Sequence, residues 1–197
     1  MAKLELYFDF LSPYTYLAST QLQAIAERTG SEVTYTPFQI LKLMKLVGNR
    51  PTTVESANKN RYARADLARW AARYGVPVSP HPKIREFDIA ALDCGALVAA
   101  ELGRAQPYVH GILRAMWGVP VDLTDRAELT RLLDSLGFEG EKLLQTAAEP
   151  RYLEQLEKNT QHAADRGAFG SPTFYVGSEM FFGNDRLDFV EQALKTS

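Results

Sequence analysis

The chain has 197 residues, of which 46% are hydrophobic and 23% are charged, and its formal net charge is −2. This composition is that of a globular protein with a sizeable core, and the mixing of Lys and Arg with acidic residues argues against nucleic-acid binding. No apolar run reaches membrane-spanning length, and acidic Glu5 and Asp9 within the first apolar segment are unlike a signal peptide. The single cysteine, Cys94, excludes an intramolecular disulfide. We therefore expect a cytoplasmic enzyme or binding protein with no nucleic-acid or membrane partner.

The first segment predicts a strand followed directly by a helix. Within residues 3–9, apolar side chains alternate with others, as they do in a strand. Ser12 stands before Pro13, the pairing expected at a helix start, because the hydroxyl accepts a backbone N–H and proline lacks a donor that the helix would not use. This helix would run from Pro13 to about Arg28, with Gly30 as its C-cap. Its positive N-terminus makes the turn favourable for an anion.

The rest of the chain predicts a second strand, a block of helices, and then two more strands and a final helix. Residues 33–38 predict a second strand, parallel to the first, and a short helix leads into the turn at residues 48–51. Helical spacing then predicts helices at about 57–74, 89–102, 106–117, 126–136, 141–148 and 150–166. Residues 170–176 and 179–182 predict a hairpin, followed by a final helix capped by Asn184 or Asp185.

This order predicts an α/β protein with a thioredoxin-like fold and a large all-helical insertion. The thioredoxin-like domain would be discontinuous, formed by residues 1–38 and 167–197, and residues 39–166 would form the helical insertion domain. Fold alone does not give function, so the chemistry has to come from a site.

The turn after the first strand is the first candidate site. Redox proteins of this fold place a Cys-x-x-Cys motif there, whereas this chain has Ser12, Pro13, Tyr14 and Thr15. Dithiol exchange at this position is therefore excluded. A hydroxyl at a helix N-terminus is suited to holding a thiolate that another molecule brings. The simpler alternative is that Ser12 is a helix cap and nothing more.

A second candidate is Ser171 before Pro172, at the opening of the hairpin. Proline cannot donate to a sheet, so it must lie at a strand start, at an edge or in a cis turn. In a cis turn, the backbone of Ser171 would be unpaired and could pair with an extended peptide. The alternative is an ordinary edge proline.

Taken together, the motifs resemble those of 2-hydroxychromene-2-carboxylate isomerases, which share their architecture with kappa-class glutathione transferases in the DsbA-like branch of the thioredoxin superfamily. The resemblance spans essentially the whole chain. It is carried by residues 8–17, 48–51, 66–70, 170–174 and 182–187. The pair formed by Ser-Pro-Tyr and Gly-Asn-Asp-Arg is specific to this group.

The resemblance implies a glutathione site in which Ser12 is catalytic and hydrogen-bonds the sulfur. Asn49 would reach the bound ligands, the Ser171 backbone would pair with the cysteinyl part, and Asn184 and Asp185 would hold the γ-glutamyl end. The full set of implied glutathione contacts is Ser12, Pro13, Tyr14, Asn49, Ser171, Pro172, Asn184, Asp185 and Arg186. The substrate would contact Lys42, Lys45, Asn49, Arg61 and Trp117. One departure is Met44, which stands where family enzymes can place a lysine.

The implied activity is a glutathione-dependent cis–trans isomerisation of 2-hydroxychromene-2-carboxylate, or a similar aromatic bicyclic acid, to trans-o-hydroxybenzylidenepyruvate through a transient glutathione adduct. Such a step belongs to aromatic hydrocarbon catabolism, as in naphthalene degradation, and the resemblance implies a homodimer. One alternative is a kappa-class-like glutathione transferase or peroxidase. Another is a non-catalytic thioredoxin-like binding protein.

The remaining reactive residues favour structural roles. His81, His110 and His162 have no partner at ligand spacing, so we expect no metal site. Cys94 lies in an apolar helical run, which favours a buried structural thiol. Aromatic residues at helical spacing, such as Trp70, favour the core over an aromatic substrate pocket.

Overall fold

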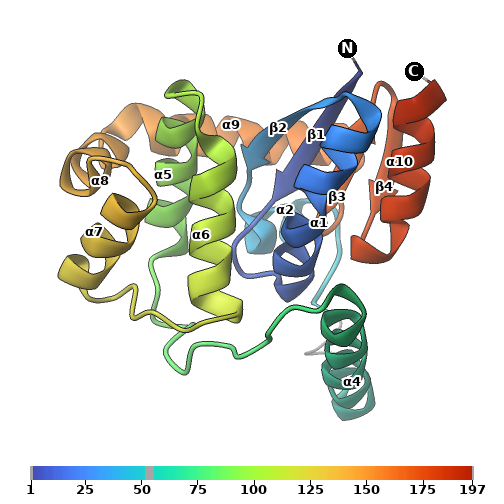
Figure 1. The fold of residues 1–197 in the computed structure, drawn as a ribbon, viewed down its shortest axis with the longest axis horizontal. Helices are drawn as coiled ribbons and strands as arrows, with labels where there is room; N and C mark the ends of the chain where they lie inside the picture. Colours follow the sequence, from blue (N-terminus) through green and yellow to red (C-terminus); the bar gives the residue numbers. More distant parts are fainter. Residues whose placement is uncertain (1, 52–55, 197) are drawn as a thin grey trace.

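The computed structural model describes residues 2–51 and 56–196 of the chain. In these ranges the strands and helices follow the expected order (Figure 1). The elements are β1 (Lys3–Phe8), α1 (Pro13–Thr29), β2 (Glu32–Pro37), α2 (Ile40–Leu46), α4 (Ala57–Tyr74), α5 (Ile89–Glu101), α6 (Ala105–Trp117), α7 (Arg126–Ser135), α8 (Gly140–Ala147), α9 (Pro150–Asp165), β3 (Thr173–Val176), β4 (Glu179–Phe182), the 3-10 turn η1 (Asn184–Arg186) and α10 (Leu187–Thr196).

The four strands form one mixed sheet in the order β2-β1-β3-β4. β1 runs parallel to β2, and the crossover between them is α1, as expected for a βαβ unit. On its other side, β1 pairs with β3 in the antiparallel sense, so that Leu6 lies between Tyr35 and Phe174. The sheet and the helices between β2 and β3 confirm the predicted thioredoxin-like α/β fold with a helical insertion.

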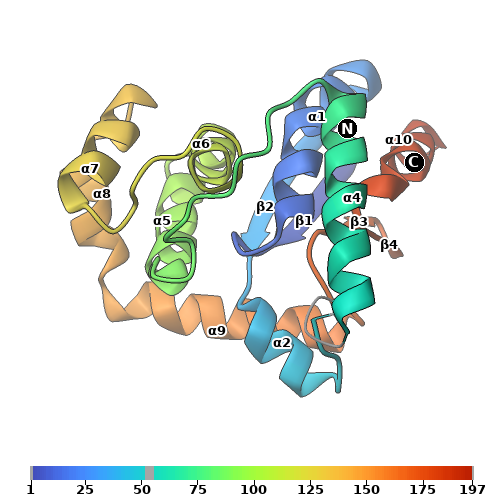
Figure 2. The ribbon, with the colours of Figure 1, turned by 90° about the horizontal axis from the view of Figure 1, so that it is seen from below.

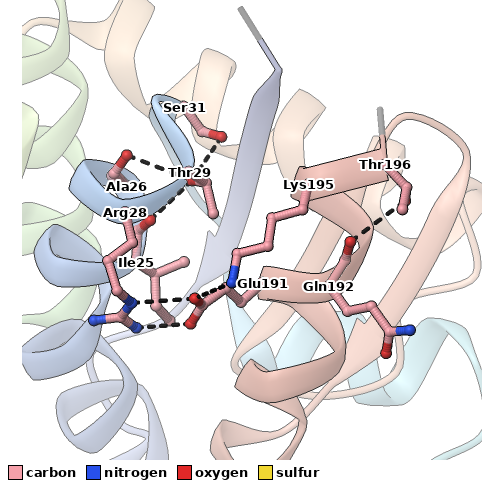
Figure 3. A network of polar contacts seen from close by, with 9 residues as sticks. All are labelled: Ile25, Ala26, Arg28, Thr29, Ser31, Glu191, Gln192, Lys195 and Thr196. Carbon is pink, nitrogen blue, oxygen red and sulfur yellow. Dashed lines mark hydrogen bonds and ion pairs between the residues drawn. The ribbon is translucent and has the colours of Figure 1, made fainter.

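Helices cover both faces of the sheet. α1 and α10 lie on one face, and α9 with α2 lies on the other (Figure 2). α5, α6, α7 and α8 stand beyond the β2 edge (Figure 1). An ion pair of Arg28 with Glu191 at 2.7 Å joins α1 to α10, and within α10 Glu191 also pairs with Lys195 at 2.8 Å (Figure 3). β1 pairs with β2 on one side and with β3 on the other, so it is an inner strand of the sheet.

The alternation in β1 separates two buried clusters. Leu4, Leu6 and Phe8 join the main cluster with α1, α6 and α10. Tyr7 points to the opposite face, where it meets Tyr175 and the residues of α9 in a smaller cluster. β1 is therefore buried on both faces at its carboxyl end, which is the end that leads into the Ser12 turn.

Two of the three predicted caps are confirmed. Ser12 is the N-cap of α1, and its hydroxyl accepts from the N–H of Thr15 at 3.3 Å. Gly30 ends the same helix with a φ of 63°, a conformation that glycine adopts without strain. The third prediction is wrong, because Asn184 and Asp185 do not cap the last helix. They form η1, a 3-10 turn that runs directly into α10.

Within residues 2–51 and 56–196, no helix combines the length and the apolarity that crossing a membrane would need. The division of the chain into a discontinuous domain (1–38 and 167–197) and an insertion (39–166) stays a prediction.

Candidate active site

The structure brings the two candidate segments, the Ser12 turn and the Ser171–Pro172 turn, into direct contact. The Ser12 hydroxyl donates to the Ser171 carbonyl oxygen at 2.8 Å. The Ser171 hydroxyl accepts from the N–H of Asp9 at 3.0 Å and shares a hydrogen bond with the Thr15 hydroxyl at 2.8 Å. Residues about 160 positions apart in the chain therefore form one hydrogen-bonded unit.

The Ser171–Pro172 peptide bond is cis, which is one of the arrangements that the sequence allowed. β3 begins at Thr173, so the proline lies just before the strand, and the expected start at residue 170 is too early. The expectation of an unpaired Ser171 backbone is wrong for its carbonyl, because the Ser12 hydroxyl already donates to it.

The η1 turn lies beside this pair. The N–H of Gly183 donates to the Pro172 carbonyl at 3.0 Å, and the Asn184 carbonyl accepts from the Tyr74 hydroxyl at 3.0 Å. The Asn184 side chain is buried, and its Nδ2 has no hydrogen-bond partner among the residues that the structure describes. Asp185 is exposed and pairs with Arg186 at 2.5 Å. The predicted γ-glutamyl end of the site is thus joined to the cis-proline turn.

Helix α4, which carries the predicted substrate contact Arg61, forms a further side of the site through Asp66 and Tyr74, and the sequence did not predict these two contacts. The Tyr14 hydroxyl donates to Asp66 at 3.1 Å, and Tyr74 of the same helix holds Asn184. Burial, followed by the charge of Asp66, raises the pKa of Tyr14, and the charge of Asp185 adds to this rise. Asp185 also contributes to the raised pKa of Tyr74, after burial as the main cause. These tyrosines therefore remain neutral hydrogen-bond donors.

Asn49 connects the loop after α2 to the segment before Ser171. Its side-chain Nδ2 donates to the Phe169 carbonyl at 2.7 Å, and its backbone N–H donates to the Met44 carbonyl at 2.8 Å. The Phe169 ring lies 4.6 Å from that of Phe182, centroid to centroid. Asn49 thus lies beside the chain that leads to the cis-proline.

The predicted substrate contacts are more dispersed. Trp117 is half-buried, and its Nε1 donates to the Phe10 carbonyl at 2.8 Å, which places it against the Ser12 turn. Lys42 pairs with Glu157 of α9 at 2.9 Å, in an open groove between α2 and α9. Lys45 and Arg61 are exposed, and Arg61 donates to Asn58 at 2.6 Å. The substrate roles of these side chains stay predictions.

Met44 is half-buried against the smaller cluster, which contains Tyr7 and Phe38. It therefore serves as a packing residue in α2.

Two buried carboxyl groups lie behind the site. Asp9 accepts from the N–H groups of Leu11 at 2.7 Å and Ile40 at 2.6 Å, yet burial outweighs these bonds and raises its pKa to about 6. Neither carboxyl oxygen of Asp93 has a hydrogen-bond partner among the described residues. Burial, followed by the charge of Asp9, raises the pKa of Asp93 well above its ordinary value. The sequence placed Asp9 on the strand and gave no sign that it is buried.

The site can therefore do two things chemically. It presents a hydroxyl and a helix N-terminus, which together stabilise a negative charge such as that of a thiolate. It also places the Ser171 carbonyl of the cis-proline turn next to that hydroxyl, where an extended peptide could pair with the carbonyl in place of Ser12.

Comparison with known proteins agrees with this architecture. A family model described as DSBA-like thioredoxin domain matches residues 3–195. The chain is 35% identical over 192 residues to a 2-hydroxychromene-2-carboxylate isomerase of Sphingobium xenophagum, with 97% of each chain covered. It is 27% identical over 209 residues to glutathione S-transferase kappa 1 of Caenorhabditis elegans, covering 99% of this chain and 92% of that one.

Among solved structures, a 2-hydroxychromene-2-carboxylate isomerase superposes with a TM-score of 0.88 at 28% identity, covering 98% of this chain and 95% of that one. The chain therefore belongs to the DSBA-like thioredoxin domain family and, within it, to the enzyme family of the 2-hydroxychromene-2-carboxylate isomerases.

Proposed function

We propose that the protein is a glutathione-dependent cis–trans isomerase that acts on 2-hydroxychromene-2-carboxylate or a similar aromatic bicyclic acid. The observation that carries the proposal is the 2.8 Å contact of the Ser12 hydroxyl with the Ser171 carbonyl, which joins a thiolate-stabilising helix end to a peptide-pairing turn. The names of the relatives support the reaction, since three of them at 29–35% identity are isomerases of this substrate.

The residues present fit glutathione, which carries two carboxylates, an amine and a thiol. Asp185 offers a carboxylate for the amine, and the buried Nδ2 of Asn184 is a donor without a partner in the described part of the chain. The Ser171 backbone offers a pairing surface for the cysteinyl part. Ser12, at the N-terminus of α1, offers a hydroxyl for the sulfur. The kappa relatives, which are named glutathione transferases, support this choice of thiol.

Bound glutathione would supply a thiolate nucleophile that is regenerated at the end of the reaction. Ser12 donates a hydrogen bond to the sulfur, and the N-terminus of α1 favours its negative charge. Lowering the pKa of a thiol by one unit takes about 1.4 kcal/mol, which a hydroxyl bond and a helix end can supply together. Lys42, Lys45, Asn49, Arg61 and Trp117 are proposed to contact the substrate, with the cations facing its carboxylate.

Turnover of 2-hydroxychromene-2-carboxylate tests this proposal. We expect isomerisation that requires glutathione and leaves its concentration unchanged. Absence of turnover, with glutathione still bound, would favour a non-catalytic thioredoxin-like binding protein and would contradict the proposal.

A second candidate is a kappa-class-like glutathione transferase or peroxidase, which the similarity to glutathione S-transferase kappa 1 favours. The same thiolate would then attack an electrophile and remain attached to it. Consumption of glutathione in step with product formation would support this candidate.

We also propose a homodimer and a cytoplasmic location, as the resemblance and the single buried cysteine suggest. Light scattering during gel filtration tests the first, and fractionation of cells tests the second. A monomeric mass over the working concentration range would contradict the dimer.

A further inference from the structure

The Ser12 hydroxyl has one proton, but the proposed site gives it two acceptors: the Ser171 carbonyl and the sulfur of the ligand. In the structure it donates that proton to the Ser171 carbonyl at 2.8 Å, while its oxygen accepts from the Thr15 N–H at 3.3 Å. A thiolate can only accept. The hydroxyl must therefore turn away from Ser171 before it can hydrogen-bond a sulfur.

The Ser171 carbonyl is held in place from several directions. The Ser171 side chain is fixed by the Asp9 N–H at 3.0 Å and by the Thr15 hydroxyl at 2.8 Å. The next carbonyl, that of Pro172, accepts from the Gly183 N–H at 3.0 Å. Because these bonds keep the turn in position, the carbonyl cannot follow the hydroxyl, and turning Ser12 would leave a half-buried acceptor without its donor.

We propose that Ser12 is a hydrogen-bond switch that the ligand operates. The cysteinyl N–H of the bound peptide replaces Ser12 as donor to the Ser171 carbonyl, and the Ser12 hydroxyl is then free to donate to the sulfur. This inference rests on the proposed function, because it concerns the same glutathione site. No covalent bond changes, since one hydrogen bond is exchanged for two.

The switch selects a class of thiol. A thiol whose neighbouring carbon carries an amide N–H, as in an N-acylated cysteine peptide, can satisfy Ser171 and receive the hydroxyl bond. With a thiol that lacks this N–H, the Ser12 hydroxyl keeps its hydrogen bond to the Ser171 carbonyl. The sulfur is then stabilised by the N-terminus of α1 alone, without a hydrogen bond from Ser12. Recognition of the peptide and activation of its sulfur are thereby coupled.

The test compares glutathione with its depsipeptide analogue, in which an ester oxygen replaces the N–H between the γ-glutamyl and cysteinyl residues. The ester has nearly the same shape but cannot donate. Each compound is bound to the wild-type protein and to Ser12→Ala, and the ionisation of the bound thiol is followed by the ultraviolet absorbance of the thiolate during a pH titration.

We expect the wild-type protein to raise the ionisation constant of bound glutathione about tenfold more than Ser12→Ala does, which is one pKa unit. For the ester, the wild-type protein and Ser12→Ala should give the same value. An ester that ionises in the wild-type protein like glutathione would overturn the switch. Loss of ester binding to both proteins would also overturn it, because the N–H would then act on affinity alone.

Failure of the proposed function gives a different result. If glutathione itself ionises equally in wild-type protein and Ser12→Ala, Ser12 does not hold the sulfur, whatever the ester does. The proposed role of Ser12 at the sulfur and the switch would then be rejected, whereas a wild-type protein that does not bind glutathione would reject the glutathione site itself.

Discussion

Ser12 is the N-cap of α1 and is proposed to hold the thiolate, and the two roles can be separated by substitution. Ser12→Ala removes the N-cap and should cost about 1 kcal/mol of stability, whereas Ser12→Gly should cost a few tenths. Both variants lose the hydroxyl, so we expect both to lose isomerase activity by roughly 10- to 100-fold, the equivalent of one hydrogen bond to a charged group.

Urea unfolding and steady-state kinetics of the two variants provide the check. If the two variants lose the same activity while their stabilities differ, the loss is due to the missing hydroxyl and not to destabilisation. If Ser12→Gly kept wild-type activity while Ser12→Ala lost it, the serine would be no more than a cap.

Asp93 should make the protein less stable as the pH rises. Burial raises its pKa in the folded state, so this state binds a proton more tightly than the unfolded chain does. The resulting stabilisation is complete below the unfolded pKa of 3.8 and is lost as the pH rises toward the folded value, by up to about 1.4 kcal/mol per unit. Asp9, with its pKa raised to about 6, acts in the same direction between pH 3.8 and 6.

The comparison is Asp93→Asn, which is neutral at every pH and nearly the same size. Relative to the wild-type protein, its free energy of unfolding should increase between pH 4 and pH 8. Asp125→Asn is the matched control, because exposed Asp125 is likewise an aspartate at a helix N-terminus, where it caps α7 through the Ala127 N–H at 2.8 Å, and its charge does not contribute to the raised pKa of Asp93. A stability difference for Asp93→Asn that does not vary with pH would contradict the raised pKa.

At the scale of elements, α4 is attached to the site by tyrosine hydroxyls. Tyr74→Phe removes the bond to the Asn184 carbonyl and keeps the ring, so the η1 turn loses one support. A hydrogen bond of this kind is worth about 1 kcal/mol, and we expect glutathione to bind about fivefold more weakly.

Calorimetric titration with glutathione measures this effect. Tyr62→Phe is the control on the same helix, because the Tyr62 side chain is largely exposed, and its affinity should be unchanged. Equal affinities for the two variants would show that α4 does not support the γ-glutamyl end.

At the scale of the whole molecule, the main buried cluster crosses the predicted boundary between the sheet and the helical insertion. It contains Leu6, Leu17 and Phe174 from the sheet side, and Ile112 and Leu133 from the insertion. A shared core of this kind should unfold in one step.

We therefore expect coincident urea transitions from far-ultraviolet circular dichroism, which reports on helices, and from tryptophan fluorescence. Trp70→Phe would leave Trp117, bonded to the Phe10 carbonyl, as the reporter at the junction. Two separated transitions would instead establish residues 39–166 as an independent folding unit.

The sequence predicted the order of elements well because periodicity, caps and turns are local. Ser12 and Gly30 were identifiable as caps for that reason. The parts that could not be predicted depend on contacts between distant segments. Three such features arise only when the helices pack, and no local sequence pattern predicts them. They are the burial of Asp9, the hydrogen bond from Trp117 to the Phe10 carbonyl and the hydrogen bond from Tyr74 to the Asn184 carbonyl. Asn184 and Asp185 were expected to cap the last helix but form a 3-10 turn. The sequence could not separate the two structures, because Asn and Asp are favoured both at helix caps and in turns.

Much of the candidate site is joined through main-chain atoms. The carbonyls of Ser171, Pro172 and Asn184 and the N–H groups of Asp9 and Gly183 all take part in its bonds. Main-chain groups are present whatever the side chain, so a lineage can replace many neighbouring residues without losing the outline of the site. We therefore expect substitutions of side chains around the proposed site to change substrate preference, while the main-chain outline of the site is retained.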